Sequence, residues 1–454
     1  MLPKRPVKQI SFHAHLDKNT TSAWDMLANP LVLVFIALVW LLSIDMHLSA
    51  DGVEHLRLTL ANKEIFIVNE ARLHAYWLLQ WPIEVAFFLG AHQLGTFVKA
   101  FAIGVLFVLV APWILLSFKI RERGRYTSLC YLYLLAIAST TLPTIYILGT
   151  DHQVIIPLTF MASLLLSQLH KNTMPWNILA LIFMFLLCKT YETNLIPLTT
   201  FLVYLIYTAY KKNLSTKTLF IVGAGILICL TGIYDSTISI IYPRDLSNRD
   251  SFVGAFKNSL SNPAFITFML VLSAIIALQW KKTVAVLLLF AAALYQFYCY
   301  QTPNLYQFAA GISFSSRTLT LLFPSFFAVI ILTKTKFKVT FPIMWFSSCV
   351  LAISLTLLAY PFYDFKRKVV AELQHTQGFV AAADHKLGNH PAAWPWTFPS
   401  ISMVWQPLCA GGALLNPNPG GWQPYDPENV SGFGDYLSYK PWMYADNSEL
   451  SRCL

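Results

Sequence analysis

Long apolar runs separated by short polar links constrain the fold of this chain more than any other feature. A helix needs about 20 mostly apolar residues to cross a bilayer, so the runs predict an all-α polytopic membrane protein with about 11 transmembrane helices. Two short runs, 176–188 and 195–210, predict a helix pair that meets below the outer surface. The expected spans are about 30–48, 97–118, 126–148, 153–169, 176–188, 195–210, 218–241, 262–280, 283–301, 318–333 and 339–361.

The links between the runs alternate between two kinds. Residues 1–29 and the basic links carry 17 of the 32 Lys and Arg residues but only three of the 22 acidic residues. Basic links stay in the cytoplasm, so we expect the mixed links to face outward. This asymmetry accounts for the net charge of +10, and no basic domain is left to bind nucleic acid. The basic links are 119–125, 170–171, 211–217, 281–282 and 334–338, and the mixed or acidic links are 50–80, 149–152, 189–194, 243–257 and 302–317.

The composition divides the chain into three parts. We expect residues 1–29 to form a cytoplasmic N-terminal segment, residues 30–364 a transmembrane domain and residues 365–454 an extracytoplasmic C-terminal domain. Apolar runs stop in the last part, and Trp, Pro, Gly, Asn and Tyr become frequent, which predicts a small, irregular α+β domain. Cys409 and Cys453 lie in this part, and an oxidising compartment would let them pair.

The first outer link is unusually long. Its residues 50–60 and 64–90 mix apolar and polar side chains, which predicts one or two helices lying in the membrane interface, followed by re-entry. The alternative, a full span over 75–91, would place every later link on the other side of the membrane. The basic link 119–125 would then lie outside, so we reject this alternative.

Three carboxylates follow the first span closely. Asp45, Asp51 and Glu54 would lie at the edge of the hydrocarbon layer, where a charge is costly unless it is needed. One of them could act as a general base that takes a proton from an acceptor hydroxyl. The alternative is structural, with Asp51 capping the following helix and Glu54 simply solvated.

The remaining outer links contribute candidates for substrate binding. Arginine matches phosphate oxygens bidentately, so an outward Arg could hold a lipid phosphate, although anchoring of the spans at the headgroups explains the same residues. Turn formation or ion pairing is the alternative for the other links. No metal-binding motif and no nucleotide-binding loop occurs, so an ATP-driven pump is not expected. The candidates are Asp151, His152, Lys189, Glu192, Arg244, Arg249 and Arg317.

The layout as a whole resembles the C-type superfamily of integral-membrane glycosyltransferases. The resemblance rests on a carboxylate directly after the first span, helices before the second, many further spans and a C-terminal outer domain. Bacterial aminoarabinose transferases and arabinofuranosyltransferases are similar in layout. The resemblance implies a hexosyl- or pentosyltransferase in the bacterial inner membrane. Its donor would be a polyprenyl-phosphate sugar, and its acceptor a glycan, lipid or protein.

By the same resemblance, Asp51 takes the role of the catalytic carboxylate of the first loop, with Glu54 or Asp45 as alternates. The family's adjacent pair of acidic residues is absent, because Gly52 follows Asp51. A divalent cation therefore stays an open question.

Two other functions remain open on the sequence. A secondary transporter or flippase would need ionisable residues near the middle of the bilayer, and only Asp235 stands out there. A polysaccharide polymerase or ligase also uses polyprenyl carriers, but its key outer loop usually lies late in the chain.

Overall fold

The computed structural model of the 454-residue chain describes most of its helices and a few positions of its C-terminal part. The described residues are 29–49, 51–65, 67, 70–91, 93–120, 122–143, 148–191, 194–211, 214–242, 263–277, 281–301, 322–334, 339–375, 378–381, 387, 390, 392–393, 401, 404–405 and 413–416.

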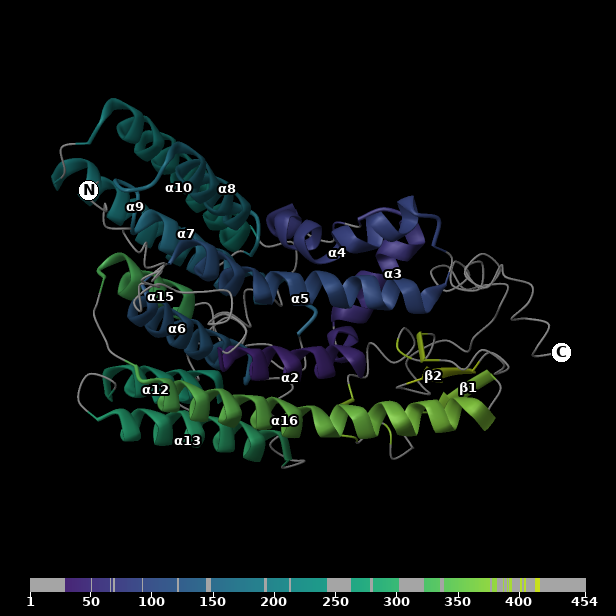
Figure 1. Cartoon of the computed structure of the whole chain (residues 1–454). Helices are drawn as coiled ribbons and strands as arrows, with labels where there is room; N and C mark the ends of the chain where they lie inside the picture. Colours follow the sequence, from purple (N-terminus) through teal and green to yellow (C-terminus); the bar gives the residue numbers. More distant parts are fainter. Residues whose placement is uncertain are drawn as a thin grey trace, which may run out of the picture.

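Thirteen α-helices account for nearly all of this described part (Figure 1). Each of the eleven predicted spans coincides with one helix, and the other two helices lie in the first outer link. Four helices, α5, α10, α13 and α16, are long and apolar enough to cross a membrane. The bounds are α2 Leu31–Ser43, α3 Asp51–Asn62, α4 Leu73–Phe88, α5 Leu94–Lys119, α6 Arg123–Thr141, α7 Ile155–Leu166, α8 Met174–Cys188, α9 Leu195–Lys211, α10 Thr216–Ile241, α12 Pro263–Ala277, α13 Lys282–Gln301, α15 Leu322–Leu332 and α16 Phe341–His375.

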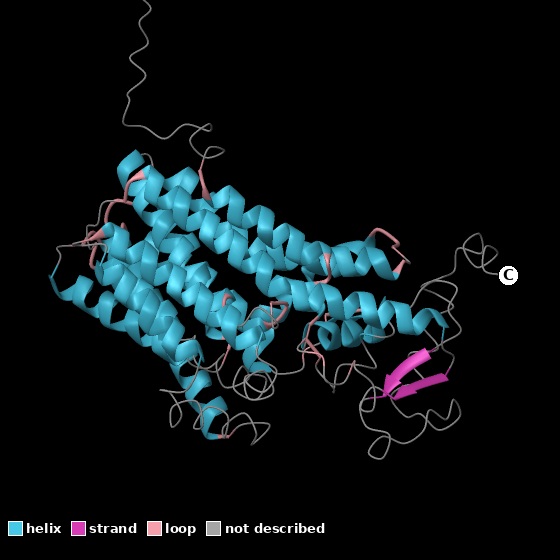
Figure 2. Ribbon diagram, turned by 90° about the horizontal axis from the view of Figure 1, so that it is seen from below, coloured by secondary structure: helices cyan, strands magenta, loops and turns pink. Residues whose placement is uncertain are grey.

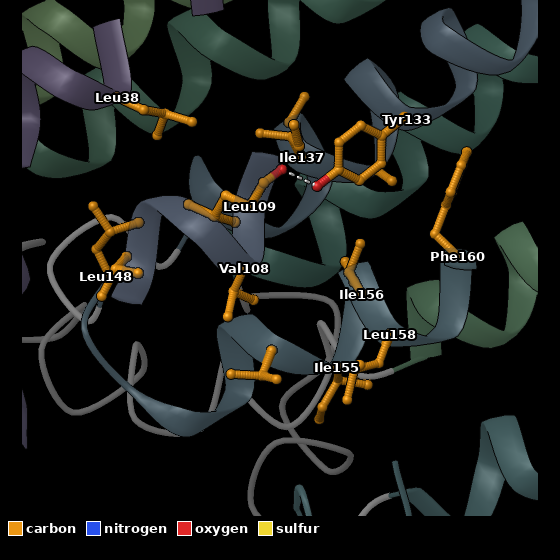
Figure 3. Close-up of a cluster of buried hydrophobic side chains, with 14 of the residues drawn as sticks. Leu38, Val108, Leu109, Tyr133, Ile137, Leu148, Ile155, Ile156, Leu158 and Phe160 are labelled. Atoms are coloured by element: carbon orange, nitrogen blue, oxygen red, sulfur yellow. Dashed lines mark hydrogen bonds between the residues drawn. The ribbon is translucent and has the colours of Figure 1, made fainter. Parts of the chain in front are cut away.

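Helices α6 and α7 form the centre of the bundle. Every residue of α7 is buried, and so are most residues of α6. Figure 3 shows Phe160 of α7 near Tyr133 of α6, whose hydroxyl donates to the Leu109 carbonyl of α5 at 2.5 Å. A helix that is buried on nearly all sides must be surrounded by other helices, and α6 and α7 are surrounded in this way.

The helix ends separate the predicted basic links from the first outer link. Lys119, the last residue of α5, lies over the ring of Trp176 in the first turn of α8 at 4.5 Å. The basic links 119–125 and 170–171 therefore share one end of the bundle. At the other end Lys366 of α16 reaches Asp45, two residues beyond α2. The basic links 119–125 and 170–171 thus lie at the end of the bundle opposite Asp45.

Helix α4 differs from the expectation of a helix lying flat in the interface. It packs antiparallel to α5, because Leu79 meets Gly104 and Phe87 meets Phe97 further back along α5. A Cβ on Gly104 would lie 1.9 Å from the Leu79 carbonyl oxygen, so glycine permits the close approach. Gly104 precedes Lys119 by about 22 Å of helix at about 1.5 Å per residue. Helix α4 therefore lies beside the half of α5 that is farther from Lys119.

The start of α4 also lies against the end of α8. The His74 backbone N–H donates to the Lys189 carbonyl, and His74 Nδ1 donates to the Leu186 carbonyl, both at 2.9 Å. Helix α4 thus begins where the short α8 ends (Figure 1). The expectation that the spans around 176–210 meet below the outer surface stays a prediction.

The expected boundary at residues 364 and 365 falls within α16, which continues to His375. Side-chain pairs explain the continuation, since Asp364 binds Arg367 and Lys368 one turn later at 3.1 and 2.6 Å. Beyond α16, the short strands β1 (Gly378–Ala381) and β2 (Ala413–Asn416) pair in parallel. They lie at one end of the molecule (Figure 2).

Candidate functional site

The first outer link turns sharply after α2 and meets a second link there. Asp45 adopts φ 66°, a left-handed conformation that lets the short helix η1 (Met46–Leu48) fold back under α3. A Cβ on either Gly52 or Gly149 would lie 1.9 Å from the His47 carbonyl oxygen. Only glycine fits at both positions, so the links that carry Asp51 and Asp151 meet at the backbone of His47.

The three candidate acids differ in their surroundings. Asp45 Oδ2 accepts from Lys366 Nζ at 2.5 Å, and Glu54 Oε2 accepts from Arg57 Nε at 2.6 Å. Both carboxylates therefore already bind a cation. Asp51 is the first residue of α3, but its side chain lies outside the described part of the structure.

Asp151 and His152 begin the short helix η4 (Asp151–Val154), which leads into α7 and lies against α4. Their side chains are outside the described part, so only their backbone is placed. The structure brings their link together with the start of α3, as the contact between Gly52 and Gly149 shows.

Lys189 lies directly after α8, half-buried, and its carbonyl binds the start of α4. Two basic residues near Lys189 were not among the candidates predicted from the sequence. One is His74, and the other is the buried Arg72, whose guanidinium lies 4.4 Å from the centre of the Tyr191 ring. Arg72 ends the short helix η2 (Glu70–Arg72), and His74 is the second residue of α4. An Arg and a His among apolar and aromatic residues were the signal in the sequence.

Four predicted residues lie outside the described residues: Glu192, Arg244, Arg249 and Arg317. The cysteines of the expected pair, Cys409 and Cys453, lie there too. These predictions stay predictions.

A line of buried polar side chains between α3 and α4 was also missed. Thr59 donates to Gln80 Oε1 at 2.6 Å, and His55 meets the Tyr76 ring edge-on at 5.0 Å between centres. His55 and Thr59 are four residues apart on α3, and Tyr76 and Gln80 are four apart on α4, so each pair shares a helix face. All four side chains are buried.

The C-terminal part contacts the same end of the bundle through α16. Lys366, which binds Asp45, also lies 5.8 Å from the centre of the Trp405 ring. Two residues earlier on α16, Asp364 Oδ2 lies 3.2 Å from His390 Nε2, and the Phe365 ring packs on His390. Burial lowers the pKa of His390 from its ordinary value of 6.5, and the hydrogen bond to Asp364 offsets this shift only in part.

Asp235 lies in the second half of α10. It follows Gly232 by three residues on α10, and a Cβ on Gly232 would lie 2.6 Å from Cys188 Sγ, in the last residue of α8. Asp235 is therefore close to the junction of α8 and α4.

Among the residues that the structure describes, no group of three His, Cys, Asp or Glu side chains is placed to hold a metal ion. No protein family, curated protein or solved structure matches the chain.

Proposed function

We propose that this multi-pass membrane protein is a glycosyltransferase that moves a sugar from a polyprenyl-phosphate donor to a glycan, lipid or protein. The reaction takes place at the outer face of the cytoplasmic membrane. The observation that carries the proposal is the meeting of two acidic links, those of Asp51 and Asp151, at the His47 backbone. They meet at the end of the bundle opposite the basic links, where a lipid-linked donor is available and nucleotide sugars are not.

The chemistry needs one base and a stable leaving group. In the proposed step, Asp51 takes the proton of an acceptor hydroxyl, and that oxygen forms a bond to the anomeric carbon of the sugar. The bond between the anomeric carbon and the phosphate oxygen breaks, and the polyprenyl phosphate leaves with the electron pair. Arg72 and Lys189 at the junction of α8 and α4 join the predicted Arg244, Arg249 and Arg317 as cations that can stabilise this charge.

The contacts of Asp45 and Glu54 leave Asp51 as the proposed base. Lys366 occupies an oxygen of Asp45 and Arg57 an oxygen of Glu54, so a substrate hydroxyl would have to displace a cation at either carboxylate. Asp51 begins α3, beside the point where the two acidic links meet.

The test compares three isosteric variants in membrane vesicles supplied with radiolabelled polyprenyl-phosphate sugars. Asp51→Asn should lower the transfer rate by a factor of roughly 10² to 10⁴, while Glu54→Gln and Asp45→Asn retain more activity. Protein level and detergent-solubilised elution profile serve as folding controls. Full activity in Asp51→Asn would remove Asp51 from the mechanism.

A further inference from the structure

Helix α4 exposes large apolar side chains and buries polar atoms. Trp77 and Phe88 are 56% and 89% accessible. Gln80, on the side toward α3, is fully buried, and one turn later Oε1 of the half-buried Glu84 is buried as well. Buried polar groups on a helix with exposed apolar side chains are costly in a membrane protein and indicate a site.

The polar groups between α3 and α4 are only partly satisfied. We use the name α3–α4 seam for His55, Thr59, Tyr76, Gln80 and Glu84. Gln80 Oε1 accepts from Thr59, but Gln80 Nε2 and Glu84 Oε1 have no hydrogen-bond partner among the residues that the structure describes. Buried polar atoms in native proteins are normally hydrogen-bonded, so an amide donor and a carboxylate acceptor await a partner here.

The two unsatisfied atoms restrict the chemistry of that partner. Gln80 Nε2 needs an acceptor, whereas the carboxyl oxygen Glu84 Oε1 can accept from a donor. A phosphate group offers acceptors and would be repelled by Glu84. Hydroxyl groups donate and accept at once, so a sugar satisfies both atoms.

The seam also lies close to the proposed base. His55 follows Asp51 by four residues on α3, so the seam begins one helical turn from the proposed base. We propose that the α3–α4 seam binds the hydroxyl groups of the donor sugar. This inference rests on the proposed function and assigns the part of the site that distinguishes a sugar-bearing lipid from the bare lipid phosphate.

The experiment measures binding rather than transfer. The Asp51→Asn protein in nanodiscs is titrated with decaprenyl phosphate and with the same lipid carrying arabinofuranose, mannose or glucosamine. We expect at least one sugar-bearing lipid to bind more tightly than the bare lipid phosphate. Adding Gln80→Met should lower the affinity for the sugar-bearing lipid about tenfold, because one hydrogen bond to the sugar is lost. The affinity for decaprenyl phosphate should stay unchanged. Thr59→Val should lower the affinity for the sugar-bearing lipid less.

The chain offers a matched control. Gln296 of α13 donates to Thr267 of α12, so it is also a buried Gln paired with a Thr, but it lies outside the seam. Gln296→Met should leave the affinity for the sugar-bearing lipid unchanged.

The outcomes separate the two proposals. If neither kind of lipid binds, the proposed function fails. The seam assignment is overturned if the lipids bind but Gln80→Met leaves the affinity for the sugar-bearing lipid unchanged. It is also overturned if, with the seam intact, no sugar-bearing lipid binds more tightly than the bare lipid phosphate.

Discussion

The α3–α4 seam and the central pair α6 and α7 both bury hydroxyl and other polar groups, but they satisfy them differently. In α6, the hydroxyls of Ser139, Thr140 and Thr141 donate to carbonyls three or four residues earlier in the same helix. In the seam, Thr59 and Gln80 bond between helices and leave further polar atoms open. Polar groups that are satisfied within their own helix need no neighbour, so this part of α6 serves as a scaffold. Gln80 Nε2 and Glu84 Oε1 in the seam lack a hydrogen-bond partner among the described residues, so we expect a bound ligand to supply one.

The largest effect on stability should come from the central pair. Phe160→Ala removes a buried ring that packs on Tyr133, and comparable truncations cost about 3–5 kcal/mol of unfolding free energy. Thermal unfolding in detergent measures the loss. Phe220→Ala, at a position that is 72% exposed, is the control and should change little. An equal loss in both variants would remove the distinction between scaffold and periphery.

Gly149→Ala tests the meeting of the two acidic links. The new Cβ would collide with the His47 carbonyl oxygen, so the links must separate, at a cost of roughly 1–3 kcal/mol and with at least tenfold less transfer. Gly95→Ala is the matched control, since a Cβ there meets nothing within 4 Å. Unchanged transfer by Gly149→Ala would show that the contact between the links does not shape the site.

Lys366→Met should have a smaller effect. It removes the ion pair with Asp45, whose partners are 27% and 18% exposed, and we expect a loss of about 1 kcal/mol. The contact with Trp405 would weaken as well, so limited proteolysis should cut the C-terminal part faster. Arg367→Met, at a side chain that is 69% exposed, should leave the cleavage rate unchanged. Equal cleavage of both variants and wild type would show that Lys366 does not hold this part in place.

The smallest effect concerns pH. Because burial lowers the pKa of His390 in the folded protein, the unfolded chain binds the proton more readily. The stabilisation from docking His390 on α16 is therefore complete above about pH 6.5, the usual pKa of histidine, and declines as the pH falls below it. Proteolysis of the C-terminal part measured between pH 5.5 and 8 should accelerate at the acidic end, and His390→Gln should abolish the change. Faster cleavage at the alkaline end would contradict the sign of the shift.

Much of the helix pattern could be predicted because hydropathy and helix length are local properties. The run at 97–118 became α5, and the charge pattern placed Lys119 at the end opposite Asp45. The stacking of α4 on α8 could not be predicted, since it depends on bonds between His74 and Leu186, 112 residues apart. The extension of α16 to His375 could not be predicted from hydropathy, because several of the residues after 364 are charged.

The candidate site was predicted in part. Asp45, Asp51 and Glu54 could be named from their position after an apolar run, but the ion pairs that distinguish them join partners such as Lys366, 321 residues away. The seam was missed for a different reason. His55 and Thr59, or Tyr76 and Gln80, have the spacing of any amphipathic helix, and the sequence does not show that this polar face points inward.

The most direct test of the account is a cryo-EM map of the Asp51→Asn protein in nanodiscs with a bound polyprenyl-phosphate sugar. The account predicts density for the sugar between the start of α3, the Gly149 link and α4. The phosphate should lie toward Arg72 and Lys189. Lipid density at the opposite end, beside Lys119 and Trp176, or sugar density away from Asp51, would contradict it.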